Sequence, residues 1–305
     1  MNKHEQNSLT MLTPTLIWPG LDVAQTNSVR RIRARFERAR KQSIPARDAL
    51  ALTAAALGIE ASPAGALARL ADGLPVAERS WFRAAPVSLL PDRDRLLVLP
   101  LDEAAQLSSQ EAEALIAAAH AHFGSALALE RGASGRWYAA LADVNDVSSA
   151  PLDAVAGTQV DIPALAQGKD AALLRRFLNE LQMLWYAHPV NVARREAGRS
   201  EANALWLWGG GRLPARQTVN GPVTIQASAP ELVGLAIHCG LDHAPPGEPG
   251  TDTAGRIVVV APGEEAIGQA WLAALAGRRA AFRLYTADVE WHIPARSGLS
   301  ALFAW

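Results

Sequence analysis

The chain has 305 residues, and its 29 basic and 30 acidic side chains give a formal net charge of −1. This balance argues against a protein whose main role is to bind nucleic acid, because such proteins usually carry a basic excess. Half of the residues are hydrophobic and 19% are charged, which is enough apolar material for a packed core. We therefore expect one large globular domain or two smaller ones.

Cysteine usage and hydropathy limit the location of the protein. Cys239 is the only cysteine, so the chain cannot form an intrachain disulfide or a thiolate zinc site. No run of about 18 apolar residues occurs, and no apolar segment of signal-peptide length precedes Pro14. We expect a cytoplasmic protein without a membrane span.

Residues 1–78 predict a small N-terminal helical region. Apolar residues recur at spacings of three and four over residues 29–41, as in an amphipathic helix. A second helix is predicted over 46–57 and ends at Gly58. The segment from Arg30 to Lys41 carries seven basic residues on its other faces. These side chains predict a protein-binding surface or a solvated face, and we expect no nucleic-acid partner.

Residues 79–305 alternate predicted strands and helices. The predicted strands lie at 81–101, 136–141, 205–208, 223–227, 256–261 and 281–286, and the predicted helices at 108–123, 170–188, 228–239 and 264–276. Four apolar residues run continuously at 96–99, as in a strand buried on both faces. Capping-box patterns begin at Ser108 and Ser228. We predict an α/β domain with a mixed, mostly covered sheet and flanking helices, preceded by the small helical region.

Two segments contain candidate ligand-binding residues. The polar segment 190–203 carries side chains that can clamp a carboxylate or phosphate, namely Asn191, Arg194, Arg195, Arg199 and Asn203. The turn Gly209, Gly210, Gly211, followed by Arg212, can form a backbone nest for an anion. The alternatives are that the asparagines satisfy backbone groups, the arginines are solvated, and the glycines allow a sharp turn.

Other polar residues favour structural roles. His188, at the end of a predicted helix, is a favourable partner for the helix dipole and its terminal carbonyls. Arg83 and Arg136 lie beside tryptophans, which predicts stacking of the guanidinium groups on Trp81 and Trp137. His120 and His122 are two residues apart and face different sides of their helix. The group His238, Asp242 and His243 is not expected to converge, so we predict no metal site.

Residues 188–214 read HPVNVARREAGRSEANALWLWGGGRLP, which resembles a stretch of the archaeal-type cofactor-independent phosphoglycerate mutases. The larger block 81–214 resembles the RpfE-type bacterial regulatory proteins, through WFRAAPVSLLPDRDRLLVL at 81–99, GRWYAAL at 135–141 and LNELQML at 178–184. The sequence departs from the RpfE-type pattern at Ala85 and Ser88, where that family usually carries Asp and His.

The mutase resemblance implies a domain inserted into an alkaline-phosphatase-like core. It also implies catalysis by a phosphorylated serine and two divalent metals held by Asp and His side chains. No such ligand set is apparent before Trp81 or after Pro214. The sequence therefore predicts a non-catalytic regulatory or binding protein without cofactor or metal, whose ligand is a small phosphorylated or carboxylated metabolite. The alternative is a phosphoglycerate mutase-like or phosphatase-like enzyme.

Overall fold

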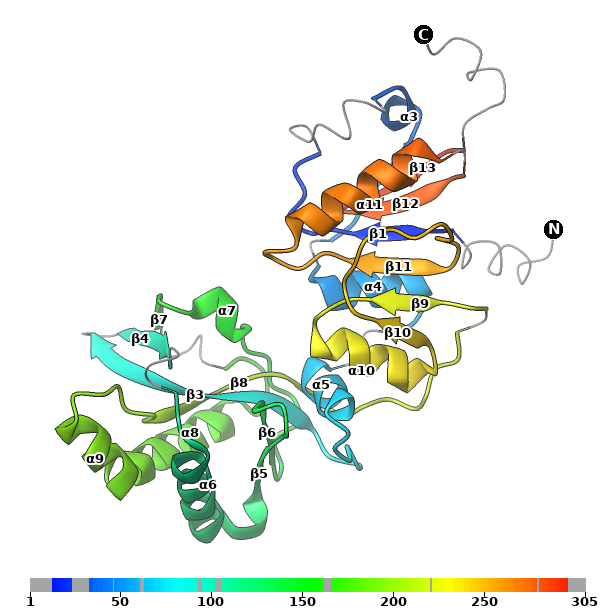
Figure 1. The fold of residues 1–305 in the computed structure, drawn as a ribbon. Coiled ribbons are helices and arrows are strands. Elements are labelled where there is room, and N and C mark those ends of the chain that lie inside the picture. Colours follow the sequence, from blue (N-terminus) through cyan, green and yellow to red (C-terminus); the bar gives the residue numbers. More distant parts are fainter. Residues whose placement is uncertain are drawn as a thin grey trace. The chain divides into compact units, whose positions relative to one another are not determined.

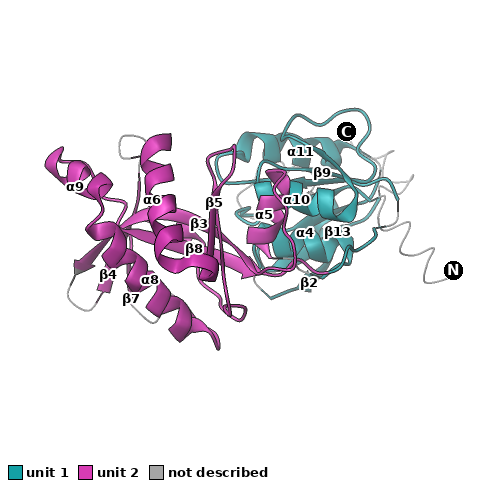
Figure 2. Ribbon diagram, turned by 90° about the horizontal axis from the view of Figure 1, so that it is seen from below, with its two compact units in different colours: residues 1–61, 215–305 teal, residues 62–214 magenta. Residues whose placement is uncertain are grey.

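A computed structural model describes residues 13–23, 33–45, 47–60, 63–92, 95–101, 106–161, 166–219, 221–278 and 280–295. The chain forms two compact units, unit 1 (residues 1–61 and 215–305) and unit 2 (residues 62–214) (Figure 2). Unit 2 is thus inserted into the sequence of unit 1, and the predicted boundary after residue 78 lies inside unit 2. The predicted mixed α/β class is confirmed.

Unit 1 is built on a sheet with the strand order β10-β9-β11-β1-β12-β13-β2 (Figure 1). Its strands are β1 (Thr15–Ile17), β2 (Arg40–Ser43), β9 (Thr224–Gln226), β10 (Asp242–Ala244), β11 (Arg256–Val259), β12 (Phe282–Tyr285) and β13 (Val289–Ile293). The five strands β10, β9, β11, β1 and β12 pair in parallel, in that order across the sheet. β13 pairs antiparallel with both β12 and β2. Because β1 lies between β11 and β12, the two ends of the sequence complete one sheet.

The helices of unit 1 are α3 (Arg33–Glu37), α4 (Ala49–Leu57), α10 (Pro230–Cys239) and α11 (Glu265–Gly277). α4 ends at Gly58, which adopts the left-handed conformation with φ 69°, as predicted. α10 begins with Pro230 at its first turn and has no side-chain cap, so the predicted capping box at Ser228 is wrong. The described helices include none that is both long and apolar enough to cross a membrane.

The predicted helix over residues 29–41 is shorter than expected. α3 ends at Glu37, and the residues from Arg40 belong to β2. Residues 24–32 lie outside the described part of the chain. Arg35 is buried, and its guanidinium donates at 2.8 to 3.3 Å to five carbonyl oxygens, those of Leu275, Ala276, Arg278, Ala280 and Pro294. Arg35 therefore satisfies the C-terminal end of α11. A protein-binding role for the exposed Arg38 and Arg40 stays a prediction.

Unit 2 contains an antiparallel sheet in which the long strand β3 is central. Its strands are β3 (Trp81–Asp92), β4 (Arg95–Pro100), β5 (Leu127–Arg131), β6 (Trp137–Leu141), β7 (Gln159–Asp161) and β8 (Ala204–Gly211). The order is β5-β6-β3-β4-β7, and β8 also pairs with β3. Within β4 only Val98 is buried, so the expected strand covered on both faces is wrong.

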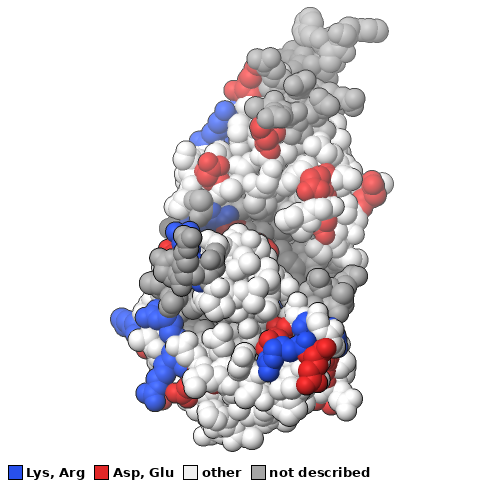
Figure 3. Space-filling view, turned by 90° about the vertical axis from the view of Figure 1, so that its left-hand side faces the viewer, with Lys and Arg blue, Asp and Glu red and all other residues white. Residues whose placement is uncertain are grey.

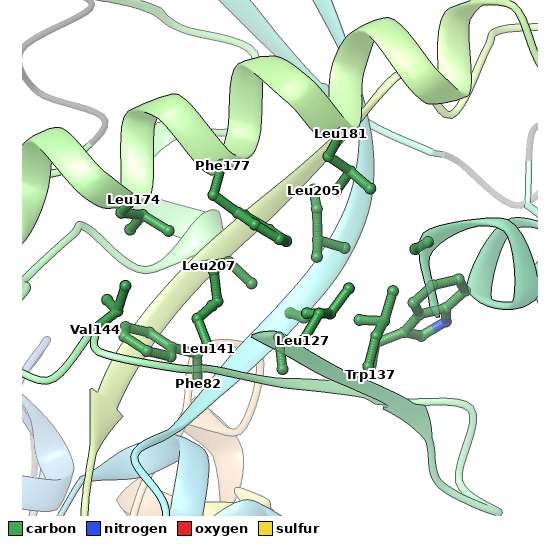
Figure 4. Close-up of a cluster of buried hydrophobic side chains, with 14 of the residues drawn as sticks. Phe82, Leu127, Trp137, Leu141, Val144, Leu174, Phe177, Leu181, Leu205 and Leu207 are labelled. Atoms are coloured by element: carbon green, nitrogen blue, oxygen red, sulfur yellow. The ribbon is translucent and has the colours of Figure 1, made fainter. Parts of the chain in front are cut away.

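Helices pack on both faces of this sheet. The helices of unit 2 are α5 (Ala64–Ala71), α6 (Ser109–Phe123), the 3-10 turn η1 (Gly124–Ala126), α7 (Leu152–Val155), α8 (Ala171–Tyr186) and α9 (Pro189–Glu196). α6 and α8 lie on one face, and α5 and α7 on the other. Leu174, Phe177 and Leu181 of α8 meet strand residues such as Phe82 and Leu207 in the larger core, which α6 also lines (Figure 4). The capping box of Ser108 and Glu111 at the start of α6 is confirmed. α9 takes up the first half of the predicted polar segment 190–203.

The surface charge matches the balanced composition. Figure 3 shows small groups of Lys and Arg and of Asp and Glu, separated by a larger area of other residues. The described residues on this face form no broad basic surface.

We predict that Gly210→Ala destabilises unit 2. A Cβ at this position would lie 2.0 Å from Cε1 of the Phe82 ring. Relieving this overlap requires the core to shift, at a cost of about 1–3 kcal/mol or more in the free energy of unfolding. Urea unfolding measures the loss. Gly277→Ala is the control, because a Cβ there meets no heavy atom within 4 Å. If Phe82→Leu restored none of the stability of Gly210→Ala, contact with the ring would not be the cause.

Candidate functional site

The sheet face of unit 2 opposite α6 and α8 carries alternating arginine and aromatic side chains. We call this set the arginine-aromatic stack, and its members are, in order, Trp81, Arg69, Tyr138, Arg83 and Trp208. The Arg69 guanidinium carbon lies 3.6 Å from the centre of the Trp81 ring and 5.8 Å from that of Tyr138. The Arg83 guanidinium carbon lies 5.8 Å from the centre of the Tyr138 ring and 5.3 Å from that of Trp208. All four distances are within the range of cation-π attraction.

Strand pairing explains the position of Arg83 in this stack. Alternate residues of a strand point to opposite faces, so Phe82 enters the larger core while Arg83 lies on the other face. Tyr138 of β6 and Trp208 of β8 are the direct cross-strand partners of Arg83. Directly opposed side chains on one face are neighbours. The guanidinium is therefore flanked by a ring from each adjacent strand.

The inner end of the stack is a buried hydrogen-bonded network. Arg69 is 2% exposed and forms an ion pair of 2.7 Å with Glu130. The Asp72 carboxylate, 4% exposed, accepts hydrogen bonds from Arg136, Ser134 and the Tyr138 hydroxyl. Burial by itself would raise the pKa of Asp72, but the hydrogen bonds from these three groups outweigh it and lower that pKa. Burial, together with the hydrogen bond to Asp72, raises the pKa of Tyr138 to about 12.

The outer end of the stack is partly open to solvent. Arg83 and Trp208 are partly exposed, and so are Ala85 and Pro86, which follow along β3. The sequence predicts that Arg83 stacks on Trp81 and Arg136 on Trp137. The structure instead places Arg83 against Tyr138 and Trp208, and Arg136 against Asp72. The Arg83 guanidinium is only partly exposed, and its Nε is buried.

The two predicted ligand-binding asparagines bond to the backbone. Asn191 is fully buried on α9, where its amide donates to the carbonyl oxygens of Trp185 (2.8 Å) and Ala202 (3.0 Å) and accepts from the Ala202 N–H. The Asn203 amide bonds both the N–H (2.8 Å) and the carbonyl oxygen (3.0 Å) of Leu89. These contacts account for both asparagines without a ligand.

The structure brings only some of the predicted arginines together. Arg194 is buried and lies 3.0 Å from the Glu111 carboxylate, which Arg199 approaches at 3.4 Å. The same carboxylate accepts the backbone N–H of Ser108 in the capping box. Burial would raise the pKa of Glu111, but these hydrogen bonds and the Arg194 charge lower it. Arg195 lies elsewhere on α9, with its guanidinium on Glu201 at 2.5 Å and over the Tyr186 ring.

The glycine turn lies within β8 and packs closely. Trp81 pairs with Gly211 and Arg83 with Trp208, so β8 contains one extra residue in a bulge at Gly209 and Gly210. Gly209 has φ 60°, and a Cβ there would lie 2.8 Å from the Ala64 side chain. The backbone conformation and the close packing at this position are sufficient to explain the glycine, and a ligand is not needed to explain it.

Arg212 follows this bulge and is exposed. Within the described part of the chain its guanidinium makes no hydrogen bond or ion pair. Of the predicted ligand-binding residues, Arg212 keeps its donors most accessible.

The predicted histidine roles are partly corrected. His188 does not cap a preceding helix, because it is the N-cap of α9 and its Nδ1 accepts the Val190 N–H at 3.2 Å. Burial lowers the pKa of His188. Among the described residues, no group of three or more His, Cys, Asp and Glu side chains is arranged to hold a metal ion. The two-metal ligand set that the mutase resemblance implies therefore does not fit the described residues.

We predict that Asn203→Ala destabilises the protein by about 1–3 kcal/mol, because it leaves the backbone N–H and carbonyl oxygen of Leu89 without their partner. Thermal and urea unfolding measure this change. Arg212→Ala, which removes an exposed side chain, should leave the free energy of unfolding within about 0.5 kcal/mol of the wild type. An equal loss in both variants would contradict the assignment of Asn203 to the backbone.

We predict a contribution of Asp72 to stability that depends on pH. Because its pKa is lower in the folded chain, ionised Asp72 stabilises the protein fully above the ordinary carboxyl pKa of about 4. This contribution is lost as the pH falls through the lowered pKa. Asp72→Asn should cost about 1–3 kcal/mol at pH 7 and less at pH 3, measured by urea unfolding. Asp161→Asn, which removes an exposed ion pair with Arg95, is the control. A cost for Asp72→Asn that is the same at both pH values would contradict the prediction.

Comparison with known proteins gives distant matches, and no family model matches the chain. It is 32% identical over 96 residues to the 2,3-bisphosphoglycerate-independent phosphoglycerate mutase of Methanosarcina mazei, covering 30% of this chain and 24% of that protein. The identity to the Methanosarcina barkeri enzyme is 26% over 147 residues, 46% of this chain and 36% of that protein. A probable mutase of Geobacter sulfurreducens is 34% identical over 82 residues, 26% of this chain and 21% of that protein.

Two solved structures are also similar at low scores. A cofactor-independent phosphoglycerate mutase from Thermoplasma acidophilum matches with a TM-score of 0.41 and 14% identity, over 92% of this chain and 89% of that one. The PH0037 protein from Pyrococcus horikoshii matches with a TM-score of 0.46 and 14% identity, over 93% of this chain and 87% of that one.

These findings correct the main functional expectation. The curated relatives are all named phosphoglycerate mutases, which contradicts the prediction of a non-catalytic regulatory protein and favours the enzyme alternative. The matches span only about a fifth to about a third of the length of those relatives. The chain is therefore distantly similar to cofactor-independent phosphoglycerate mutases.

Proposed function

We propose that this chain is a phosphoglycerate mutase-like enzyme that acts on a small phosphorylated carboxylic acid. The sequence similarity to curated mutases of Methanosarcina and Geobacter, at 26 to 34% identity over the matched segments, carries this proposal. A phosphorylated acid offers two anionic groups, and both suit bidentate hydrogen bonding by arginine.

The arrangement of unit 2 is compatible with such a substrate. Arg83 is partly exposed and lies between the rings of Tyr138 and Trp208. Arg212 is exposed at the end of β8, whose Gly211 pairs with Trp81. We assign substrate binding to guanidinium groups of this kind and assign no step to a metal ion, because the described residues do not supply the metal ligands.

Two narrower assignments belong to the same proposal. The motifs at 81–99, 135–141 and 178–184 support membership of the RpfE-type bacterial proteins. The single cysteine, Cys239, which is buried and unpaired, supports a location in the reducing cytoplasm.

A direct assay tests the proposed activity. The purified full chain is incubated with 3-phosphoglycerate or 2-phosphoglycerate, in parallel with Mn²⁺, with Mg²⁺ and with EDTA. Phosphorus NMR follows interconversion of the two esters and release of inorganic phosphate. We expect one of these conversions in at least one condition. A mock purification from the same host, lacking the chain, controls for host mutases. A folded preparation that converts neither ester in any condition would contradict the proposal.

A further inference from the structure

We propose that the exposed side of α8 binds the same side of α8 in a second copy of this chain, with the two helices antiparallel. The inference rests on the residues of unit 2 and not on the proposed function. We call this side the α8 stripe, and its members are Leu173, Arg176, Glu180 and Met183. They follow one another at spacings of three, four and three residues, so they lie along one side of the helix.

The two ends of the α8 stripe are apolar and exposed. Figure 4 shows Leu174, Phe177 and Leu181 of α8 in the core, and the stripe lies outside that set. Met183 is 75% exposed, more than any other large hydrophobic side chain in the described part of the chain, and Leu173 is 43% exposed. Covering these two side chains would remove apolar surface from water, which favours association.

The middle of the α8 stripe carries both signs of charge. Nε of Arg176 lies 3.1 Å from Oε1 of Glu180 on the same helix. Oε2 of Glu180 lies 4.0 Å from Nε2 of His122, which borders the stripe. Within the described residues, the two terminal nitrogens of the Arg176 guanidinium make no hydrogen bond. Their N–H groups are therefore available to a carboxylate of a second chain.

The order of the four residues makes the α8 stripe complementary to itself. Positions 173 and 183 are each five residues from position 178, and positions 176 and 180 are each two residues from it. Two α8 helices that pair antiparallel about a twofold axis at position 178 therefore place Leu173 against Met183 of the second copy. The same axis places Arg176 against Glu180 of the second copy. Each contact occurs twice, because a twofold interface repeats every contact.

A parallel pairing of the same two stripes is unfavourable. It would set Arg176 beside Arg176 and Glu180 beside Glu180, and like charges in contact oppose association. The antiparallel pairing instead alternates the charges and covers both apolar side chains. Ala172 and Asn179 are exposed beside the stripe, and their short side chains allow a second helix to approach closely.

Sedimentation velocity of the full chain over a range of concentrations tests the inference. We expect an equilibrium between monomer and dimer. Arg176→Glu sets a carboxylate against Glu180 of the second copy, twice in each dimer, and should weaken dimerisation by about tenfold or more. Adding Glu180→Arg to this variant exchanges the two charges and should restore the dimer. Arg95→Glu reverses a charge in an exposed ion pair of β4, and as the control it should leave the dissociation constant unchanged.

Disulfide cross-linking tests the antiparallel register. A chain with both Leu173→Cys and Met183→Cys should form a covalent dimer on a non-reducing gel, because each new cysteine meets the other one across the axis. Within one helix the two positions are about 15 Å apart, too far for a disulfide. Each single variant sets its cysteine against an unchanged side chain and should stay a monomer on the gel. The native Cys239 is buried and is present in every variant.

Several outcomes would overturn the inference. They are a wild type that sediments as a monomer at every concentration, a dimer that Arg176→Glu leaves intact, and a charge exchange that restores nothing. Cross-linking of either single variant as efficiently as the double variant would contradict the antiparallel register. Circular dichroism checks that each variant is folded, and cross-linking decides alone if Arg176→Glu is not. None of these readouts uses phosphoglycerate, so failure of this inference is distinguishable from failure of the proposed function.

Discussion

The pairing of β3 along both of its edges organises unit 2. β6 and β4 pair with β3 on one edge and β8 on the other, so every residue of β3 is assigned to one of two faces. One face supplies Phe82 to the core under α6 and α8, and the other supplies Trp81 and Arg83 to the arginine-aromatic stack. The bulge in β8 is essential to this arrangement. Gly209 and Gly210 let β8 approach Phe82 and α5 without side chains in between, and so place Trp208 opposite Arg83.

Arginine performs several different roles in this chain, and its surroundings decide which. Arg35 is buried among backbone carbonyl oxygens and donates hydrogen bonds to those at the C-terminal end of α11. Arg194 is buried against Glu111 and connects α9 to the start of α6. Arg83 is partly exposed and flanked by the rings of Tyr138 and Trp208. A buried guanidinium whose donors are all engaged by the protein serves the fold, because any ligand would have to displace existing hydrogen bonds.

The similarity to mutases and the side chains of the described residues point to different ways of neutralising a phosphate group. The curated relatives are named for phosphoglycerate, while the described side chains of this chain supply guanidinium groups and no assembled metal-ligand cluster. Arginine and a divalent cation can both neutralise phosphate charge, but they differ in what they require of the protein. A metal site needs several oxygen or nitrogen ligands that converge, whereas one arginine needs only to be held in place.

The sequence by itself determined the features that depend on neighbouring residues in the chain. The capping box at Ser108, the helix end at Gly58 and the apolar stripe of α8 were all predictable, because their signals lie within a few residues. It did not predict α9, whose first turn begins with Pro189 after the His188 cap. Nor did it place β1 between β11 and β12, or set Tyr138 and Trp208 beside Arg83. Only the tertiary structure decided those neighbours, because strand register joins residues that are distant in the sequence and that no local periodicity connects.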